Sequence, residues 1–552
     1  MELAEAHAEL EAAQVLRGDA FVHDLVFEAT LAGIPAAVKG LLHSRTARYL
    51  QGRRNPNPAV IARHYLEAGD ELSAAEFLVR ASQQAMNSSL LAEARGFSER
   101  AIAIYRQHAD PREYEAVAEL FEVLGVNGSF EEMGETSARL VRLARDPKEK
   151  AKAMANWAIW LYMTRRFAGA LAKVDEALAI VGPDDLWSQT TLNQTALLCC
   201  IRLGRFGRAW EALAAYQHSA QQMGRLGIPR ALEAQGASVE DEGVLLSALD
   251  RHAEAIAQYN RTLAMIDQHE QFHYAKARIL SRRAHSELSL GDTEAALRDI
   301  AESKAVAEQY AVSARGLVWP LTGEALTLLA LGRLPEAWEA AQEAERLDRV
   351  EPPKVTYLML ALMLGALGQR ERGLAELEAF LSLGDTHLSA NVSARILQAQ
   401  LGQNPQPLGE AEALLGDTPK PELQARLRLA KARFADPDAA LSLSEEALEL
   451  VTPLGLKLAE AAALTQKAQA LLKLGRLEEA RAAIEQALNH PASLLSPAER
   501  HFTAYEILGG LGDADAKAHL EAAQNWIHQT AQKLPKDLRA AFLGQPAHQK
   551  IL

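Results

Sequence analysis

The sequence contains few of the residues on which disulfide-stapled or sheet-rich proteins depend. Only 2 of its 552 residues are cysteine, Cys199 and Cys200, and two adjacent cysteines are poorly placed to join distant segments. The disulfide framework of a small secreted protein is therefore excluded, which fits a reducing compartment. Aromatic residues make up only 6% of the chain. Since β-branched clusters are also scarce, strands are not expected to dominate.

An excess of basic charge and a long apolar run are also absent. The chain has 58 Lys plus Arg against 72 Asp plus Glu, a net charge of -14. Because an acidic surface repels phosphate, we expect no direct nucleic-acid contact by this chain. The most apolar stretch, residues 357–367, is much shorter than the roughly 20 residues of a membrane-spanning helix. The acidic N-terminus lacks the basic region of a signal peptide. These features predict a soluble, cytoplasmic protein that makes no membrane contact.

The residues that are abundant favour helices, and one short pattern recurs along the chain. Ala, Leu, Glu and Arg dominate, and all are strong helix formers. The pattern places an apolar residue before Gly, then polar residues, then Ala. Clear copies are Leu203–Ala209, Leu290–Ala296, Leu331–Ala337 and Leu474–Ala480. Weaker copies lie near residues 164, 249, 367 and 511, with further candidates near Gly69, Gly128, Gly402 and Ala435.

Each position of this pattern has a physical reason in a helix pair. Glycine tolerates the positive φ that ends a first helix, and a small residue lets the second helix approach closely. Turns recur about every 33 to 46 residues, near the tetratricopeptide period. The sequence therefore resembles the tetratricopeptide family from about residue 60 to residue 525. It departs from the pattern at Arg165 and Asp250, which replace the turn glycine. The resemblance implies an all-α, right-handed solenoid of about twelve helix pairs.

A different signature precedes the repeats. It comprises residues 21–29 (FVHDLVFEA), residues 42–47 (LHSRTA) and, after a proline-rich loop, residues 61–70 (IARHYLEAGD). This segment resembles the junction that follows the nucleotide-binding module of bacterial STAND-type signalling ATPases, where a winged helix leads into a tetratricopeptide-like sensor. The expected domains are a helical junction over residues 1–85, a repeat array over 86–525, and a capping helix and tail over 526–552. In that family the solenoid receives an inducer or partner, and a separate domain contacts DNA.

Motifs for catalysis are few. No Gly-x-x-x-x-Gly-Lys-Ser/Thr sequence occurs, so P-loop chemistry by this chain is excluded. Residues 269–273 (HEQFH) match the zinc-protease motif, in which His269 and His273 would bind zinc and Glu270 would act as base. The motif falls at a seam between repeats, which favours a polar turn over a metal site. We expect a non-enzyme without cofactor.

The inward face of the first helices offers the best candidate binding residues. Counting back from each turn, we expect the following polar and aromatic residues to share this face: Asn156, Gln194, Glu240, Asp241, Arg278, Ser281, Arg282, His285 and Trp319. Arg278, Arg282 and His285 have helical spacing and could grip a carboxylate or phosphate, with Trp319 as a stacking neighbour. The alternative for each residue is an ordinary solvated helix face.

Three functions follow from these patterns. The first is a non-catalytic sensor or protein-interaction region of a bacterial signalling or transcriptional regulator. Its partner would be a protein or peptide, with a small-molecule inducer and self-association left open. The second is a free-standing tetratricopeptide scaffold that binds a peptide or helix. The third, remote from the others, is a zinc hydrolase using residues 269–273.

Overall fold

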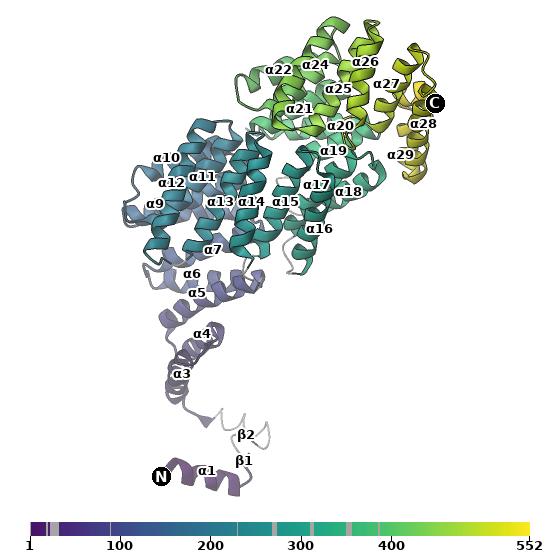
Figure 1. The fold of residues 1–552 in the computed structure, drawn as a ribbon. Coiled ribbons are helices and arrows are strands. Elements are labelled where there is room, and N and C mark those ends of the chain that lie inside the picture. Colours follow the sequence, from purple (N-terminus) through teal and green to yellow (C-terminus); the bar gives the residue numbers. More distant parts are fainter. Residues whose placement is uncertain are drawn as a thin grey trace. The chain divides into compact units, whose positions relative to one another are not determined.

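The fold is built from α-helices, as the composition predicts (Figure 1). The computed structural model describes residues 2–17, 20–21, 33–88, 90–228, 230–267, 273–309, 314–348, 356–384 and 387–552. Within these residues the strands are β1 (Leu16–Arg17) and β2 (Ala20–Phe21), which pair antiparallel. No described helix is long and apolar enough to cross a lipid bilayer. The chain divides into two units, Met1–Arg145 and Asp146–Leu552.

The first unit holds the short strands and seven described helices. They are α1 (Glu2–Ala12), α3 (Ala36–Gln51), α4 (Pro58–Glu67), α5 (Glu71–Asn87), α6 (Leu91–Gln107), α7 (Glu113–Asn127) and α8 (Phe130–Leu143). Helices α5 and α6 form one antiparallel pair, and α7 and α8 form a second. The turn at Gly69 joins α4 to α5, so this copy of the pattern lies between a leading helix and the first pair.

The second unit contains ten consecutive helix pairs. Their first helices are α9 (Pro147–Met163), α11 (Leu186–Arg202), α13 (Ala231–Ala248), α15 (His273–Ser289), α17 (Ala314–Ala330), α19 (Tyr357–Ala366), α21 (Leu388–Gly402), α23 (Pro421–Ala432), α25 (Lys457–Lys473) and α27 (Pro497–Gly510). Their second helices are α10 (Phe167–Leu178), α12 (Phe206–Arg225), α14 (His252–Ile266), α16 (Thr293–Gln309), α18 (Leu334–Asp348), α20 (Arg370–Ser382), α22 (Gln406–Leu415), α24 (Pro437–Val451), α26 (Leu477–Leu488) and α28 (Ala516–Lys533). A 3-10 turn, Thr452–Leu454, follows α24. Counting the two pairs of the first unit as well, the described residues form twelve helix pairs, which confirms the predicted tetratricopeptide-like fold.

The turns adopt the backbone that the repeat pattern predicts. Gly204 and Gly475 have φ of +72° and +74°, in the left-handed region that glycine enters without a steric cost. Arg165 and Asp250 take the same conformation, with φ of +64° and +59°. In the four clear copies the alanine that follows the turn is buried: Ala209, Ala296, Ala337 and Ala480 are each 0% exposed. The helices of a pair therefore touch closely at this position.

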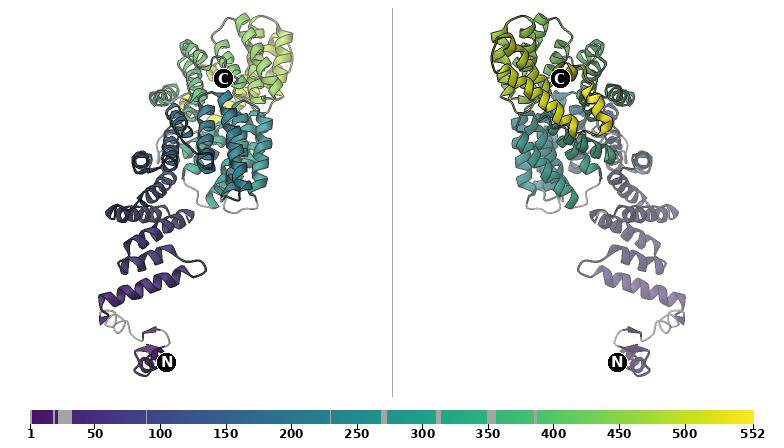
Figure 2. Two further views of the ribbon diagram at one scale, coloured as in Figure 1. Left: turned by 90° about the vertical axis from the view of Figure 1, so that its left-hand side faces the viewer. Right: turned by 90° about the vertical axis from the view of Figure 1, so that its right-hand side faces the viewer.

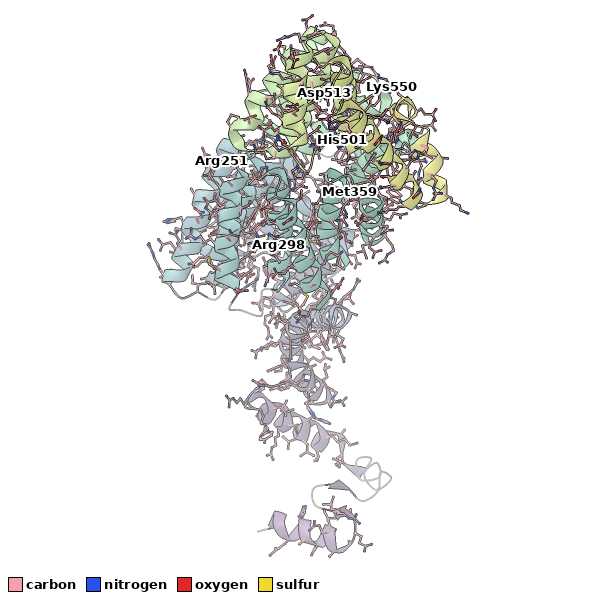
Figure 3. All side chains as sticks on the ribbon, turned by 45° about the vertical axis from the view of Figure 1, so that its right-hand side comes forward. Arg251, Arg298, Met359, His501, Asp513 and Lys550 are labelled. Carbon is pink, nitrogen blue, oxygen red and sulfur yellow. The ribbon has the colours of Figure 1, made fainter. Side chains whose placement is uncertain are left out.

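The C-terminal helices are packed into the solenoid. After α28 come α29 (Lys536–Leu543) and α30 (Pro546–Ile551) (Figure 2). Phe542 of α29 and Ile551 of α30 belong to a buried cluster that also contains Trp338 of α18 and Met359 of α19. Met359 is labelled in Figure 3. Helices separated by almost two hundred residues therefore share one core.

Contacts between helices far apart in the sequence recur along the second unit, always between helices about ten positions apart in the helix order. The turns after α11, α13, α15, α17 and α19 each meet residues in or beside a helix ten helices later, as from α11 to α21 or from α17 to α27. The joined residues are Gly204 with Leu388, Ala248 with Lys420, Asp250 with Glu422, Gly291 with Lys457, Ala330 with Ser493, Gly332 with Pro497, Gly368 with Ala541, and Ala366 with Gln545. Five helix pairs therefore complete one superhelical turn, and each turn packs directly on the next. We call these contacts the inter-turn contacts.

Candidate functional site

All nine predicted binding residues lie on first helices of five consecutive pairs. Their positions are Asn156 on α9; Gln194 on α11; Glu240 and Asp241 on α13; Arg278, Ser281, Arg282 and His285 on α15; and Trp319 on α17. The regular stacking of the pairs sets these helices side by side, in sequence order (Figure 1). Polar residues from neighbouring repeats can therefore meet.

Glu240 is the centre of the polar contacts between α13 and α15. Both its oxygens accept hydrogen bonds from Arg278, at 2.7 and 2.6 Å, and Oε1 also accepts from Arg282 Nη1 at 2.5 Å. The carboxylate is 2% exposed, whereas the side chains of Arg278 and Arg282 keep 35% and 29% of their exposure. Burial acts to raise the pKa of Glu240, but the two guanidinium groups outweigh it and hold that pKa below its usual value.

Asp241 extends the same network to α11. Its Oδ2 accepts a hydrogen bond from Gln194 Nε2 at 2.8 Å, and its Oδ1 lies 3.7 Å from Arg282 Nη1. Burial raises the pKa of Asp241, and the negative charge of Glu240 adds to the rise. Five of the predicted residues thus form one row across α11, α13 and α15, which we call the polar row. It consists of Gln194, Glu240, Asp241, Arg278 and Arg282.

The other four predicted residues lie outside these contacts. Ser281 hydrogen-bonds to the carbonyl of Ala277 at 3.2 Å and lies 3.0 Å from Ser303 Oγ of α16, so it joins the two helices of its own pair. The ring of His285 packs edge-on against His252, with centroids 6.0 Å apart. Trp319 is 55% exposed, and Asn156 is half-buried.

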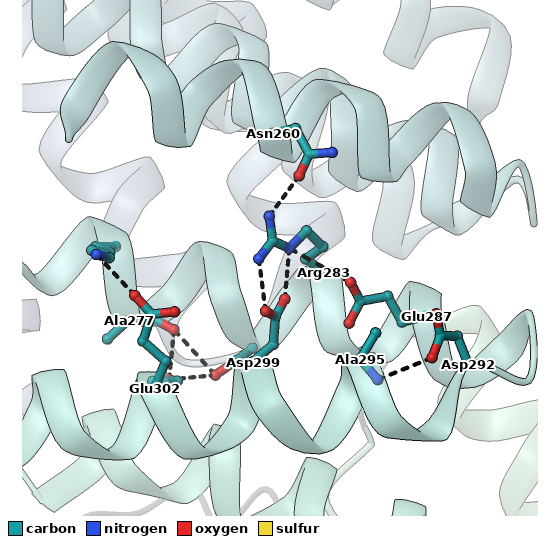
Figure 4. Close-up of polar contacts among 11 residues, drawn as sticks. Asn260, Ala277, Arg283, Glu287, Asp292, Ala295, Asp299 and Glu302 are labelled. Atoms are coloured by element: carbon teal, nitrogen blue, oxygen red, sulfur yellow. Dashed lines mark hydrogen bonds and ion pairs between the residues drawn. The ribbon is translucent and has the colours of Figure 1, made fainter.

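Arg283, next to Arg282 on α15, has different partners from the arginines of the polar row. Its guanidinium binds Asp299 of α16 through two hydrogen bonds of 2.6 and 2.7 Å, and Asn260 of α14 at 2.5 Å (Figure 4). Glu287 lies 3.7 Å from the same group, and burial, followed by the charge of Asp299, raises its pKa to about 7. Arg283 therefore holds the pairs together, whereas Arg278 and Arg282 bind the preceding first helix.

A second polar cluster, which no sequence motif predicts, lies at an inter-turn contact. Asp250 Oδ2 accepts a hydrogen bond from the backbone N–H of Glu422 at 2.8 Å, and Lys420 Nζ donates to the carbonyl of Ala248 at 2.5 Å. His252, at the start of α14, has its Nε2 3.9 Å from Glu422 Oε2. The only sequence signal here is Asp250 itself, an acidic residue where the repeat favours glycine.

His387 occupies the neighbouring inter-turn contact. Arg202 Nη1 lies 3.0 Å from its Nε2, and the N–H of Ala390 lies 3.3 Å from its Nδ1. Both ring nitrogens thus face donors, which disfavours a second ring proton. Burial, followed by the charges of Arg202 and Arg165, lowers the pKa of His387 well below its ordinary value of 6.5.

This pKa predicts that His387 weakens the fold as the pH falls. Below about pH 6.5 the unfolded chain takes up a proton on this ring and the folded chain does not, so acid favours unfolding. The loss from this residue is at most about 1.4 kcal/mol per pH unit. We expect unfolding in urea between pH 7.5 and 5.5 to depend less on pH in His387→Gln than in the wild type. The same change at exposed His528 is the control. An equal effect at both sites would contradict this assignment.

The zinc-protease motif lies largely outside the described residues. His269 to Phe272 are not among them, and His273 is the first residue of α15, with its side chain outside the description. The prediction of a polar turn at this repeat seam therefore stays a prediction. His43 of α3 and His64 of α4 do meet, with their Nδ1 atoms 2.8 Å apart. They link two helices of the first unit.

Comparison with known proteins adds only distant likenesses. No family model matches the sequence, and no curated protein matches it. Among solved structures, yeast Tom70 is 15% identical over 86% of this chain and 98% of its own, with a TM-score of 0.29. The APC/C hetero-tetramer Cut9–Hcn1 is 15% identical over 90% of this chain and 99% of its own, with a TM-score of 0.27. Such scores carry no argument about function, and the tetratricopeptide-like fold follows from the helix pairs themselves.

Proposed function

We propose that this chain is a non-catalytic sensor or protein-interaction region of a bacterial signalling or transcriptional regulator. The polar row is the observation that carries the proposal. It runs across three consecutive first helices and is followed on the next one, α17, by the exposed Trp319. A row that crosses repeats can contact an extended partner at several points, whereas a single repeat offers one.

The chemistry of the row favours a peptide or protein segment as the partner. Arg278 and Arg282 keep about a third of their side-chain exposure while bound to Glu240, so they reach both the protein and the solvent. A guanidinium carries five N–H donors in a fixed plane, which suits carbonyl and carboxylate oxygens. Trp319 offers an apolar surface for a neighbouring side chain of the partner. With a net charge of -14, the chain is a poor match for nucleic acid.

An exposed apolar face in the first unit supports the proposal that the chain belongs to a larger regulator. Helix α3 exposes four large apolar side chains, Val38, Leu41, Leu42 and Tyr49, with exposed fractions between 45% and 66%. An apolar helix face of this kind is typical of a surface that another domain covers. The α3–α4 pair contains most of the described part of the STAND-like signature, whereas residues 22–32 lie outside the description. A free-standing scaffold remains the second candidate.

Site-specific photo-crosslinking tests the proposed partner surface. A benzophenone amino acid in place of Trp319 should give an adduct with a peptide or protein in lysate of the source organism. The matched control carries the same group at Trp210 of the second helix α12, which is 37% exposed. We expect an adduct at position 319 and none at 210. Equal adducts at both positions, or none at 319, would refute the proposal. If the crosslinked partner is not part of a system with an ATPase or DNA-binding module, the free-standing scaffold is favoured.

A further inference from the structure

Three side chains that could hold a metal ion converge at one inter-turn contact. Asp250 follows α13, His252 begins α14, and Glu422 lies in the first turn of α23. Each offers one ligand atom, and these atoms all lie within 4.8 Å of one another. Asp250 is 4% exposed, His252 is 2% exposed, and the Glu422 side chain is 24% exposed. Asp250 and His252 are therefore buried and Glu422 is half-buried, unlike the acidic groups that are common on protein surfaces.

The imidazole of His252 has one nitrogen bound and one without a partner. Its Nδ1 lies 3.2 Å from Ser286 Oγ. Its Nε2 is fully buried and has no hydrogen-bond partner among the described residues, although it lies 3.9 Å from Glu422 Oε2. A buried polar atom without a partner costs about 1–3 kcal/mol. A neutral imidazole that donates through Nδ1 presents a lone pair at Nε2, which is the form that binds metals.

Hydrogen bonds from neighbouring residues orient the side chains of the cluster, as they orient the ligands of known metal sites. Ser286 holds the His252 ring, and the backbone N–H of Glu422 holds one oxygen of Asp250 at 2.8 Å. Such second-layer hydrogen bonds fix the ring and the carboxylate before a metal arrives. Lys420 opposes the binding of a cation, because its positive charge acts on the nearby carboxylate of Asp250.

We propose that Asp250, His252 and Glu422 bind one divalent cation, and that zinc suits the site best. Imidazole with two carboxylates is a donor set that zinc accepts, whereas magnesium and calcium prefer oxygen ligands alone. With bonds of about 2.0–2.2 Å, the ligand atoms of tetrahedral zinc lie about 3.4 Å apart. Small side-chain rotations would close the present separations, and water would take the fourth position. The ion would join two successive superhelical turns through residues 172 positions apart in sequence.

Cobalt and zinc titrations of the metal-free full-length chain test this site. Cobalt should bind at one equivalent and show the visible absorption of tetrahedral nitrogen and oxygen coordination, and zinc should displace it. Zinc at a hundred times its Kd should lower the unfolding equilibrium constant about a hundredfold. His252→Asn and the nearly isosteric Glu422→Gln should each remove both effects. Lys420→Gln should bind zinc about tenfold more tightly, because a nearby positive charge is lost.

Other histidines supply the matched controls. His43 and His64 lie 2.8 Å apart, His501 and His519 lie 2.9 Å apart (His501 is labelled in Figure 3), and His273 ends the zinc-protease motif. His43→Asn, His501→Asn and His273→Asn should each leave the cobalt spectrum and the zinc stabilisation unchanged. The proposal is overturned if metal binding survives in both His252→Asn and Glu422→Gln, or if the wild type binds no zinc. Circular dichroism without metal checks that each variant folds.

Discussion

Replacing Gly368 by alanine is expected to destabilise the second unit by about 2–5 kcal/mol. Gly368 has a φ of +78°, and a Cβ added there would lie 2.5 Å from the carbonyl oxygen of Ala541. Left-handed backbone costs an alanine about 1–2 kcal/mol. The clash adds about 1–3 kcal/mol, because Ala541 belongs to the backbone of α29 and cannot rotate away. Urea unfolding followed by circular dichroism measures the loss.

Gly475 is the matched control for this substitution. It occupies the equivalent turn between α25 and α26 and has a φ of +74°, but an added Cβ would meet nothing within 4 Å. Gly475→Ala should therefore show the backbone cost alone, about 1–2 kcal/mol. The difference between the two variants isolates the inter-turn contact. Equal losses at Gly368 and Gly475 would contradict the packing of α29 on the turn after α19.

Removing both arginines of the polar row is expected to cost about 3–5 kcal/mol. Arg278→Met with Arg282→Met leaves the 2% exposed carboxylate of Glu240 without its two guanidinium partners. A buried charge without a partner is far more costly than a buried amide. Adding Glu240→Gln to this double variant should therefore recover much of the lost stability. Unfolding in urea of the wild type, the double variant and the triple variant gives both quantities.

An exposed ion pair in the same unit provides the comparison. The Arg333 and Glu336 side chains are 48% and 41% exposed, and such pairs contribute less than about 1 kcal/mol. Arg333→Met should therefore have little effect, and Glu336→Gln should recover nothing in its background. If Glu240→Gln also recovers nothing in the double-arginine variant, then Glu240 is not held as a buried ion, and the polar row is a set of surface contacts.

Much of the fold could be predicted because each repeat carries its own local signals. A turn glycine with positive φ and a buried alanine mark several of the pairs, as at Gly475 and Ala480. The turn keeps its conformation even where glycine is replaced, since Arg165 and Asp250 also have a positive φ. The copy of the pattern near Gly69 does not mark a turn inside one of the twelve pairs. A glycine with positive φ ends many helices, whatever helix follows. The expected domain limits at residues 85 and 525 stay predictions.

The polar row could be anticipated in part, whereas the inter-turn contacts could not. Gln194, Glu240 and Arg278 come from consecutive repeats, so the repeat period alone places them near one another. Asp250 and Glu422 are brought together by the number of pairs in one superhelical turn. That number depends on the small rotation between successive repeats, which no single repeat encodes. His252 therefore looked like an ordinary polar residue in the sequence.

Hydrogen exchange at the amide of Ser493 tests the stacking of successive turns most directly. Ser493 lies in the connection between α26 and α27, yet its N–H donates to the carbonyl of Ala330 at 3.0 Å. The side chain and backbone of Ser493 are buried, with 2% exposure. If successive turns are packed together, this amide should exchange at least about a thousandfold more slowly than an unprotected one. Exchange as fast as at the exposed residues Arg54 and Asn55 would show that the turns do not stack and would contradict this packing.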